Sequence, residues 1–592
     1  MKAPAAQAIS LLLAGCACVL PFLLPYHQLP VLSFHAEWLA AALGTAAALA
    51  MLFGRGVPAV SMPAPALWLL PFALFLAVRA ASGGQPYPQT SVLASVYVLY
   101  AVLLIWLGAE LSAAFGIERV ALVLAGFILA GALANSLAGV IQFYGRPTLF
   151  EDIIADLRGS RAYGNIAQAN LYANYLALGE SALLLLWLRA RVRTGYAACA
   201  LALLVLGGAL SGSHGALLFA LWFAALASLA KRARDDSEAQ RLKFAAYGVA
   251  AAVLAAHAAV PWLNNALALG PVGEGEFDHS LRNSAEPRWL AWLLALRVFT
   301  ASPVVGVGVG EFAGAAFELG LDPSLASIGE VWTSPHNLPL HLLSETGALG
   351  TILALGGLCV WGGQVALRYR ADPQPALWWI VAAVGVELTH SLIEFPLWSA
   401  HFLGVTALLI GAGATLKTRS PAVSRVSWIA VATACSALCV SLGLTLRDYL
   451  RLDATHISGT TVTLASAADA QRDAATMREL THGLMAPLAE LWLVAGAPLN
   501  RSDLAAKLAM SERVARYWPA NAVVVRRAVF LALDGKTEKA RSLLERALQT
   551  FPHRRVATIS ILEQALAADP AAIEPLLATA KSAYDPANHS RE

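Results

Sequence analysis

The sequence predicts an all-α membrane protein whose helices cross the bilayer many times. Only 13% of its 592 residues are charged and 58% are hydrophobic, and the mean hydropathy is +0.62. Soluble proteins carry about 25% charged residues, and disordered chains are poor in apolar ones. The apolar residues gather in runs of about 20, the length of a membrane-crossing helix. A net charge of only +3 also provides no broad basic surface for nucleic acid.

About thirteen segments have the length and composition of transmembrane helices. They lie near residues 7–25, 37–53, 64–82, 91–108, 120–142, 169–189, 196–211, 214–230, 244–262, 346–367, 376–394, 398–416 and 426–446.

The loops between these segments predict the orientation. Four basic loops fall on the same side of the membrane as the N-terminus, namely 189–195, 231–243, 368–374 and 417–425. Because Lys and Arg are enriched in cytoplasmic loops, the N-terminus is expected in the cytoplasm. The long loop and the tail described next are then expected on the outer side.

Five regions follow from this segmentation. They are N-terminal transmembrane helices (1–142), further transmembrane helices (143–262), a large external loop (263–345), C-terminal transmembrane helices (346–446) and an external helical tail (447–592). The loop is too long for a simple connector. In the tail, apolar residues at three- and four-residue spacing predict helices that resemble a tetratricopeptide pair, with Ala540 and Ala547 as small packing residues.

Amide side chains cluster where the sixth apolar segment begins. Asn165, Gln168 and Asn170 precede or open this segment, and a helix would place Asn165, Gln168 and Tyr172 on one face. These amides could cap the helix and bond between helices. They could equally bind sugar hydroxyls or a phosphate.

Further polar residues stand at the ends of other apolar segments. His214 opens one segment, Arg288 opens the amphipathic stretch RWLAWLLALRVF, and His336 with Asn337 directly precedes another segment. Polar and charged residues at membrane depth are costly, so they are functional candidates.

Glu387, His390 and Glu394 recur at three- and four-residue spacing within an apolar segment. This spacing predicts one helix face that carries two carboxylates and an imidazole. The face could form an internal hydrogen-bond network, or it could be the proton relay of a transporter.

Metal and cofactor sites are not expected. His336 and His341 are five residues apart and have no third ligand nearby, whereas zinc takes three or four protein ligands. The glycine-rich segment GVGVGEF does not open a helix after a strand, as a dinucleotide-binding motif would.

Five motifs occur in a fixed order along residues 140–405. They are GNxxQxN from Gly164, a short SxG turn from Ser213, PRxxxW from Pro287, SPHN from Ser334 and HSxxExPLW from His390. In this order they resemble the O-antigen ligase-like superfamily of membrane glycosyltransferases. The helical tail and the last two motifs resemble the bacterial protein O-oligosaccharyltransferases, the pilin-glycosylating branch of that superfamily.

This resemblance implies a reaction and a location. Such enzymes move an oligosaccharide en bloc from a polyprenyl diphosphate to Ser or Thr hydroxyls of exported proteins such as pilins. The chain would then be a multi-pass protein of the bacterial inner membrane, in contact with membrane lipids, with its loop and tail in the periplasm. No cofactor or metal is implied.

The resemblance also implies roles for single residues. His336 would activate or orient the acceptor hydroxyl, because an imidazole is a suitable base near neutral pH. Arg288 would stabilise the diphosphate leaving group through paired N–H donors. Gln168 would lie near the diphosphate or the sugar, and Asn165, Asn170, Asn337, His390 and Glu394 would complete the substrate site.

One position departs from the family pattern. Where relatives often carry an arginine in the SxG turn, this chain has His214. Either His214 substitutes for that arginine, or Arg158 or Arg161 supplies the charge.

Two other functions are compatible with the sequence. One is an O-antigen ligase that acts on the lipid A core, or an O-antigen polymerase, since the same residues would serve those acceptors. The other is a proton-coupled transporter. Against transport, no inverted repeat and no matching pair of broken helices is apparent.

Overall fold

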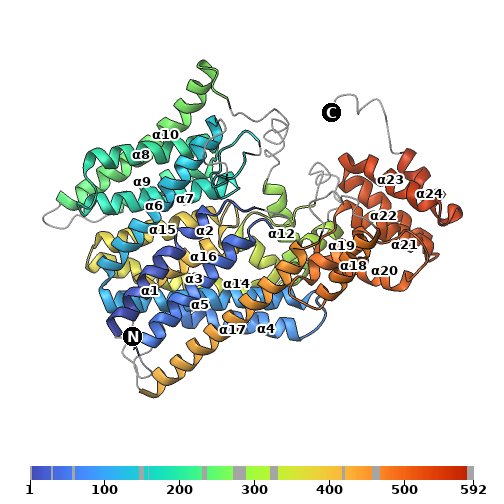
Figure 1. Ribbon diagram of the computed structural model, residues 1–592, viewed down its shortest axis with the longest axis horizontal. Coiled ribbons are helices and arrows are strands. Elements are labelled where there is room, and N and C mark those ends of the chain that lie inside the picture. The colour runs from blue at the N-terminus through green and yellow to red at the C-terminus, as the bar shows by residue number, and fades with distance from the viewer. Residues whose placement is uncertain are drawn as a thin grey trace. The chain divides into compact units, whose positions relative to one another are not determined.

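The computed structural model describes residues 3–27, 31–55, 61–145, 152–157, 159–229, 237–270, 288–319, 331–415, 421–455 and 467–582 (Figure 1). All regular secondary structure in these ranges is helical. The predicted Arg158 and parts of the predicted external loop lie outside the described residues.

The chain forms two compact units. Unit 1 contains Met1–Ala73, Val96–Ala285 and Leu353–Gly443, and unit 2 contains Leu74–Ser95, Glu286–Ile352 and Leu444–Glu592. The boundaries fall inside four helices, α4 (Ala64–Ala81), α5 (Pro88–Phe115), α14 (Leu338–Ala371) and α17 (Pro421–Asp453).

Unit 1 is built around helix α7 (Ala169–Leu188), most of whose side chains are buried. Its other helices are α1 (Ala3–Ala17), α2 (Leu20–Leu23), α3 (Phe34–Arg55), α6 (Ile117–Tyr144), α8 (Thr194–Leu210), α9 (Gly215–Ser228), α10 (Ser237–Ala266), α15 (Pro375–His390), the 3-10 turn η3 (Pro396–Trp398) and α16 (Ala400–Gly413). Helix α7 contacts α6, α8, α9, α10 and α15.

Glycines let α6 and α7 approach closely. A Cβ atom on Gly139 of α6 would lie 2.2 Å from the Tyr172 hydroxyl, and one on Gly179 of α7 would lie 2.3 Å from the Ala132 side chain. Small residues at a helix crossing are the usual means of close packing in lipid, where apolar burial does not drive association.

The expectation of a multi-pass membrane protein is confirmed. Among the described residues, nine helices are long and apolar enough to cross a bilayer: Pro4–Leu23, Phe34–Gly54, Ala64–Ala81, Pro88–Phe115, Ile117–Tyr144, Ala169–Leu188, Ser237–Ala266, Leu338–Ala371 and Arg425–Asp453. The four remaining predicted segments coincide with the shorter helices α8, α9, α15 and α16. The total of about thirteen spans stays a prediction.

Unit 2 contains the predicted tail and the described part of the predicted loop. Its helices are α12 (Arg288–Ala301), α13 (Phe312–Leu319), α18 (Ala467–Leu480), α19 (Ala486–Ala495), α20 (Leu504–Tyr517), α21 (Asn521–Leu533), α22 (Thr537–Thr550), the 3-10 turn η4 (Pro552–Arg554), α23 (Arg555–Leu566) and α24 (Pro570–Ser582). The tail helices, orange to red in Figure 1, follow one another as short packed pairs.

The tail has its own apolar core, and the two expected packing residues belong to it. Ala540 and Ala547 of α22 are fully buried beside Leu544, against residues of α21, α23 and α24. Between α21 and α22, Gly535 takes a φ of +79°, a left-handed conformation that glycine adopts without strain.

Helix α20 of the tail touches α13 backbone to backbone. A Cβ atom on Gly314 would lie 2.2 Å from the carbonyl oxygen of Arg516. The tail and the segment after α12 are therefore parts of one packed body within unit 2.

Truncation of Leu544 tests the tail core. Leu544→Ala removes a fully buried side chain, so we expect a loss of about 2–5 kcal/mol in the free energy of unfolding of unit 2. The purified full-length protein would be unfolded by denaturant and followed by tail tryptophan fluorescence. Val556→Ala, at a side chain that is 65% exposed, is the control and should cost about 0.5 kcal/mol or less.

Candidate functional site

His336 lies on a constrained turn immediately before α14. Its φ of +49° is left-handed, which is uncommon for a residue other than glycine and costs roughly 1–3 kcal/mol. The turn is held on both sides. The Ser334 hydroxyl accepts a hydrogen bond from the His336 N–H at 3.1 Å, and the Asn337 side chain accepts one from the Leu340 N–H at 3.0 Å. We call residues 334–337 the histidine turn.

Asn337 acts as the N-cap of α14, because its side-chain oxygen satisfies an N–H that has no partner within the helix. The His336 ring is half-buried and meets the Trp332 ring edge-on, with 5.2 Å between the ring centroids. The geometry thus fixes the backbone of the predicted base while its imidazole stays partly accessible.

Behind the histidine turn lies a second, buried histidine. The Nδ1 atom of His341 is 3.1 Å from the Ser334 hydroxyl, and its Nε2 atom is 3.1 Å from Oε1 of Glu345. Both side chains are nearly inaccessible. The sequence prediction did not assign a role to either residue, although their spacing of four is the signal of a shared helix face.

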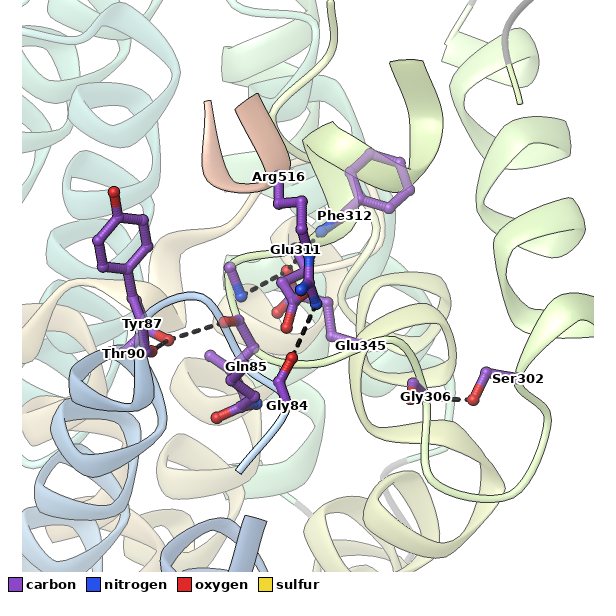
Figure 2. A network of polar contacts seen from close by, with 12 residues as sticks. Gly84, Gln85, Tyr87, Thr90, Ser302, Gly306, Glu311, Phe312, Glu345 and Arg516 are labelled. Carbon is purple, nitrogen blue, oxygen red and sulfur yellow. Dashed lines mark hydrogen bonds and ion pairs between the residues drawn. The ribbon is translucent and has the colours of Figure 1, made fainter. Parts of the chain in front are cut away.

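Glu345 also holds the glycine-rich segment GVGVGEF, residues 306–312. Its Oε1 accepts hydrogen bonds from the N–H groups of Gly310 at 2.9 Å and Phe312 at 3.3 Å. Figure 2 shows this carboxylate facing the end of the segment. One carboxylate oxygen therefore meets two amides and an imidazole.

The main chain adds a second set of bonds at the same place, because α14 is broken at Gly347 (φ +65°, ψ −172°). The carbonyls of Ser344 and Glu345 accept the N–H groups of Val307 and Gly308, each at 3.0 Å. A Cβ atom on Gly306 would lie 2.2 Å from the Glu345 carbonyl carbon. Only glycine therefore permits the segment to run this close to the helix.

Glu311 connects the glycine-rich segment to the tail. Its Oε2 forms an ion pair with Arg516 of α20, which also donates to the Gly84 carbonyl at 3.0 Å (Figure 2). Burial raises the pKa of Glu311 above its ordinary value of 4.5. The Arg516 and Arg79 guanidinium groups oppose this increase, and the Glu345 carboxylate adds to it.

Arg288 is the first residue of α12 and is half-buried. Leu290, Leu294 and Val298 of this helix form a small core with Phe312, against which Trp332 and Leu340 also pack. The helix that carries Arg288 and the segment that carries His336 are therefore parts of one packed cluster.

A second polar cluster lies in unit 1 and is centred on Asn170. The Asn170 side-chain oxygen accepts hydrogen bonds from Arg161 Nη2 at 3.0 Å and from the Ser213 hydroxyl at 2.9 Å. Its amide group donates to Glu394 at 3.0 Å. Arg161 Nε also donates to the Ser211 carbonyl at 2.7 Å. The structure thus brings together three of the predicted site residues, Arg161, Asn170 and Glu394.

Asn165 and Gln168 have local structural partners. The Asn165 amide group donates to the carbonyls of Leu23 and Ile153 at 2.9 and 2.7 Å, and its side-chain oxygen accepts from the Ala155 N–H at 3.0 Å. Gln168 is the N-cap of α7 and accepts from the Leu171 N–H at 2.5 Å.

The expected common face of Asn165, Gln168 and Tyr172 is wrong. Helix α7 begins only at Ala169, because the preceding residues form a turn in which Gly164 and Ala167 have positive φ. A pattern of polar residues does not reveal where such a turn ends.

The expected face of Glu387, His390 and Glu394 is also only partly formed. Glu387 and His390 are buried near the end of α15, where the Asn174 amide group lies 3.1 Å from Glu387 and 2.7 Å from His390 Nδ1. Helix α15 ends at His390, so Glu394 lies beyond it and faces Asn170 instead.

His214 is exposed and occupies the N-cap position of α9. It ends the turn 211–214, which Arg161 contacts through the Ser211 carbonyl. Arg161 Nε also lies 3.6 Å from the Cβ position of Gly212. Among the described residues, no three His, Cys, Asp or Glu side chains are grouped as metal ligands would be.

Comparison with known proteins places the histidine turn and Arg288 in a matched region, whereas Arg161 and Asn170 lie just before the matched residues. The family described as O-antigen ligase matches residues 173–355, and the family described as virulence factor membrane-bound polymerase, C-terminal, matches residues 378–564. The chain is also similar to the general O-oligosaccharyltransferase of Acinetobacter baylyi (strain ATCC 33305 / BD413 / ADP1). The two are 26% identical over 409 residues, which cover 68% of this chain and 69% of that protein.

The raised pKa of Glu311 predicts a pH dependence of stability. Because the folded state binds this proton more tightly than the unfolded state, the contribution of Glu311 is full below pH 4.5 and is lost as the pH rises through the raised value. The difference in Tm between the wild type and Glu311→Gln should therefore fall as the pH is raised from about 4.5 to about 8. A difference that grows over this range would contradict the assignment.

Proposed function

Because this chain belongs to the O-antigen ligase family, we propose that it moves an oligosaccharide en bloc from a polyprenyl diphosphate to Ser or Thr hydroxyls of exported proteins. The observation that carries this proposal is the histidine turn, which holds His336 in a strained conformation backed by Ser334. Strained residues cluster at active sites. The similarity to the general O-oligosaccharyltransferase of Acinetobacter baylyi supports the choice of reaction.

In the proposed reaction, the acceptor hydroxyl attacks the anomeric carbon of the donor sugar. His336 removes the proton of that hydroxyl as the new C–O bond forms. The bond from the anomeric carbon to the diphosphate oxygen breaks, and the lipid diphosphate leaves with the electron pair. The Arg288 guanidinium stabilises the negative charge of this leaving group through paired N–H donors.

The Asn170 cluster supplies polar groups for the donor. Arg161 carries a permanent positive charge beside the turn that holds the exposed His214. We assign the diphosphate or the first sugar to these two residues together with Gln168. Asn165 and His390 are buried and bonded within the protein, so we assign them supporting roles, as we do Asn337, the cap of α14.

The proposed location is the periplasmic face of a bacterial inner membrane, with the N-terminus in the cytoplasm and the tail in the periplasm. The basic loops of the sequence support this orientation.

A second candidate acceptor is a glycan, either the lipid A core or the growing end of an O-antigen. Both family descriptions, O-antigen ligase and membrane-bound polymerase, favour such an acceptor. The polymerase description covers residues up to 564 and so includes much of the tail. The tail therefore does not separate protein acceptors from glycan acceptors, and the choice between them depends on the acceptor offered in the assay.

Replacement of His336 tests the proposed base. His336→Asn removes the imidazole but keeps a residue that tolerates positive φ, so the turn should remain folded. We expect the transfer rate to fall by about 10²–10⁴-fold. The assay is co-expression with a lipid-linked glycan pathway and an exported acceptor, with the exposed His482→Asn as the control. Undiminished glycosylation by His336→Asn would reject His336 as the base.

Replacement of Arg288 tests the proposed phosphate contact. Arg288→Lys keeps the charge but loses the paired donors. The rate should fall about tenfold, which corresponds to roughly 1.4 kcal/mol of transition-state stabilisation. Arg297→Lys on the same helix is the matched control. Equal rates for the two variants and the wild type would show that Arg288 does not contact the leaving group.

A further inference from the structure

Helix α20 of the tail reaches the glycine-rich segment through two neighbouring side chains, Arg516 and Tyr517, and the Tyr517 ring would lie 3.1 Å from a Cβ atom on Gly310. Arg516 binds Glu311 and also the Gly84 carbonyl, at 3.0 Å, in the turn between α4 and α5. Its own carbonyl oxygen lies against Gly314 of α13. Arg516 is thus fixed by three different segments of unit 2, as Figure 2 shows for the first two.

Glu311 stands between the two amides that Glu345 binds. Gly310 and Phe312 precede and follow it, and both donate their N–H groups to Glu345 Oε1. A displacement of Glu311 therefore shifts both donors at once. The ion pair with Arg516 holds the residue that lies between these two amides.

From Glu345 the contacts continue to the histidine turn. Glu345 Oε1 lies 3.1 Å from His341 Nε2, and His341 Nδ1 lies 3.1 Å from the Ser334 hydroxyl. That hydroxyl accepts the His336 N–H at 3.1 Å. Four consecutive polar contacts thus lead from the glycine-rich segment to the backbone of the proposed base.

We propose that Arg516 and Glu311 are positioning residues for His336, so that the C-terminal tail is a working part of the transfer site. This inference rests on the proposed function. Neither residue touches the reacting atoms. They act by fixing the carboxylate and imidazole that support the histidine turn, and a shift of about 1 Å in a catalytic group can cost about a hundredfold in rate.

Stability alone does not explain the placement of this pair. Glu311 is only 6% exposed, but the Arg516 side chain is 49% exposed, and ion pairs that are open to water contribute little to stability. A pair that spans separate segments does, however, select one register of those segments. That is the property required to place Glu345 and the histidine turn.

The experiment compares four variants of the full-length protein in detergent or nanodiscs. Arg516→Ala removes the pair, Arg516→Lys keeps its charge, and Glu311→Gln removes the charge of the partner. Arg541→Ala is the control, because it removes an exposed ion pair with Glu545 inside α22. Each variant is assayed for kcat and KM with a lipid-linked glycan and an acceptor, and for hydrogen exchange of the amides in residues 302–312.

We expect kcat to fall about ten- to a hundredfold in Arg516→Ala and in Glu311→Gln, while KM for the donor changes little in the protein that remains folded. Arg516→Lys should recover part of the activity. The amides of Gly310 and Phe312 should exchange faster in Arg516→Ala and in Glu311→Gln only. The Arg541→Ala control should match the wild type in every measurement.

Two results would overturn the proposal. One is wild-type kcat in both Arg516→Ala and Glu311→Gln. The other is a loss of activity that follows only the loss of folded protein, without local faster exchange in any variant that folds. The exchange measurement needs no substrate. An inactive wild type would therefore reject the proposed reaction, and the exchange rates would still show whether Arg516 and Glu311 hold the glycine-rich segment in place.

Discussion

The carboxylate of Glu345 is the contact on which the rest of unit 2 depends. A buried carboxylate is strongly destabilising unless hydrogen-bond donors surround it. Here the donors are the amides of Gly310 and Phe312, with His341 on the same helix face. Because these donors belong to separate segments, satisfying one charge fixes the relative position of α14 and the glycine-rich segment. The break at Gly347 frees the main-chain carbonyls of Ser344 and Glu345 for Val307 and Gly308, since an unbroken helix would keep its carbonyls for itself.

In unit 1, the polar contacts between helices are centred on asparagine side chains, whereas in unit 2 they are centred on the carboxylates of Glu345 and Glu311. Asn170 and Asn174 lie on consecutive turns of α7. Asn174 bonds to Glu387 and His390 of α15, and Asn170 bonds to Glu394 just after that helix. An asparagine offers both donors and acceptors and carries no charge, so it can join polar groups at membrane depth at a lower desolvation cost. The more accessible of the two, Asn170, is also the one that holds Arg161. The network therefore runs from the buried Asn174 to the partly exposed guanidinium group of Arg161.

The features that could be predicted from the sequence are those that depend on residues close together in the chain. Runs of apolar residues identified the helices, and polar residues at their ends identified Asn337 and His336 before α14. Properties that depend on distant residues were not predictable. The start of α7 at Ala169 follows from a turn that Asn165 ties to Leu23 and Ile153. The pairing of Glu311 with Arg516 joins residues that are 205 positions apart, and no local pattern marks either of them.

The sequence predicts the tail as a separate helical region, whereas its packing joins it to the other segments of unit 2. An independent domain would meet its neighbour through a solvated, mostly polar surface. Here Gly314 of α13 touches the backbone of α20, and Tyr87 donates to the buried Glu490, which Arg513 also binds. Glycine at a crossing and a buried, shared carboxylate are features of a protein interior. The tail helices and the segments around the histidine turn must therefore fold together, and the constraints on His336 extend to residues almost two hundred positions beyond it.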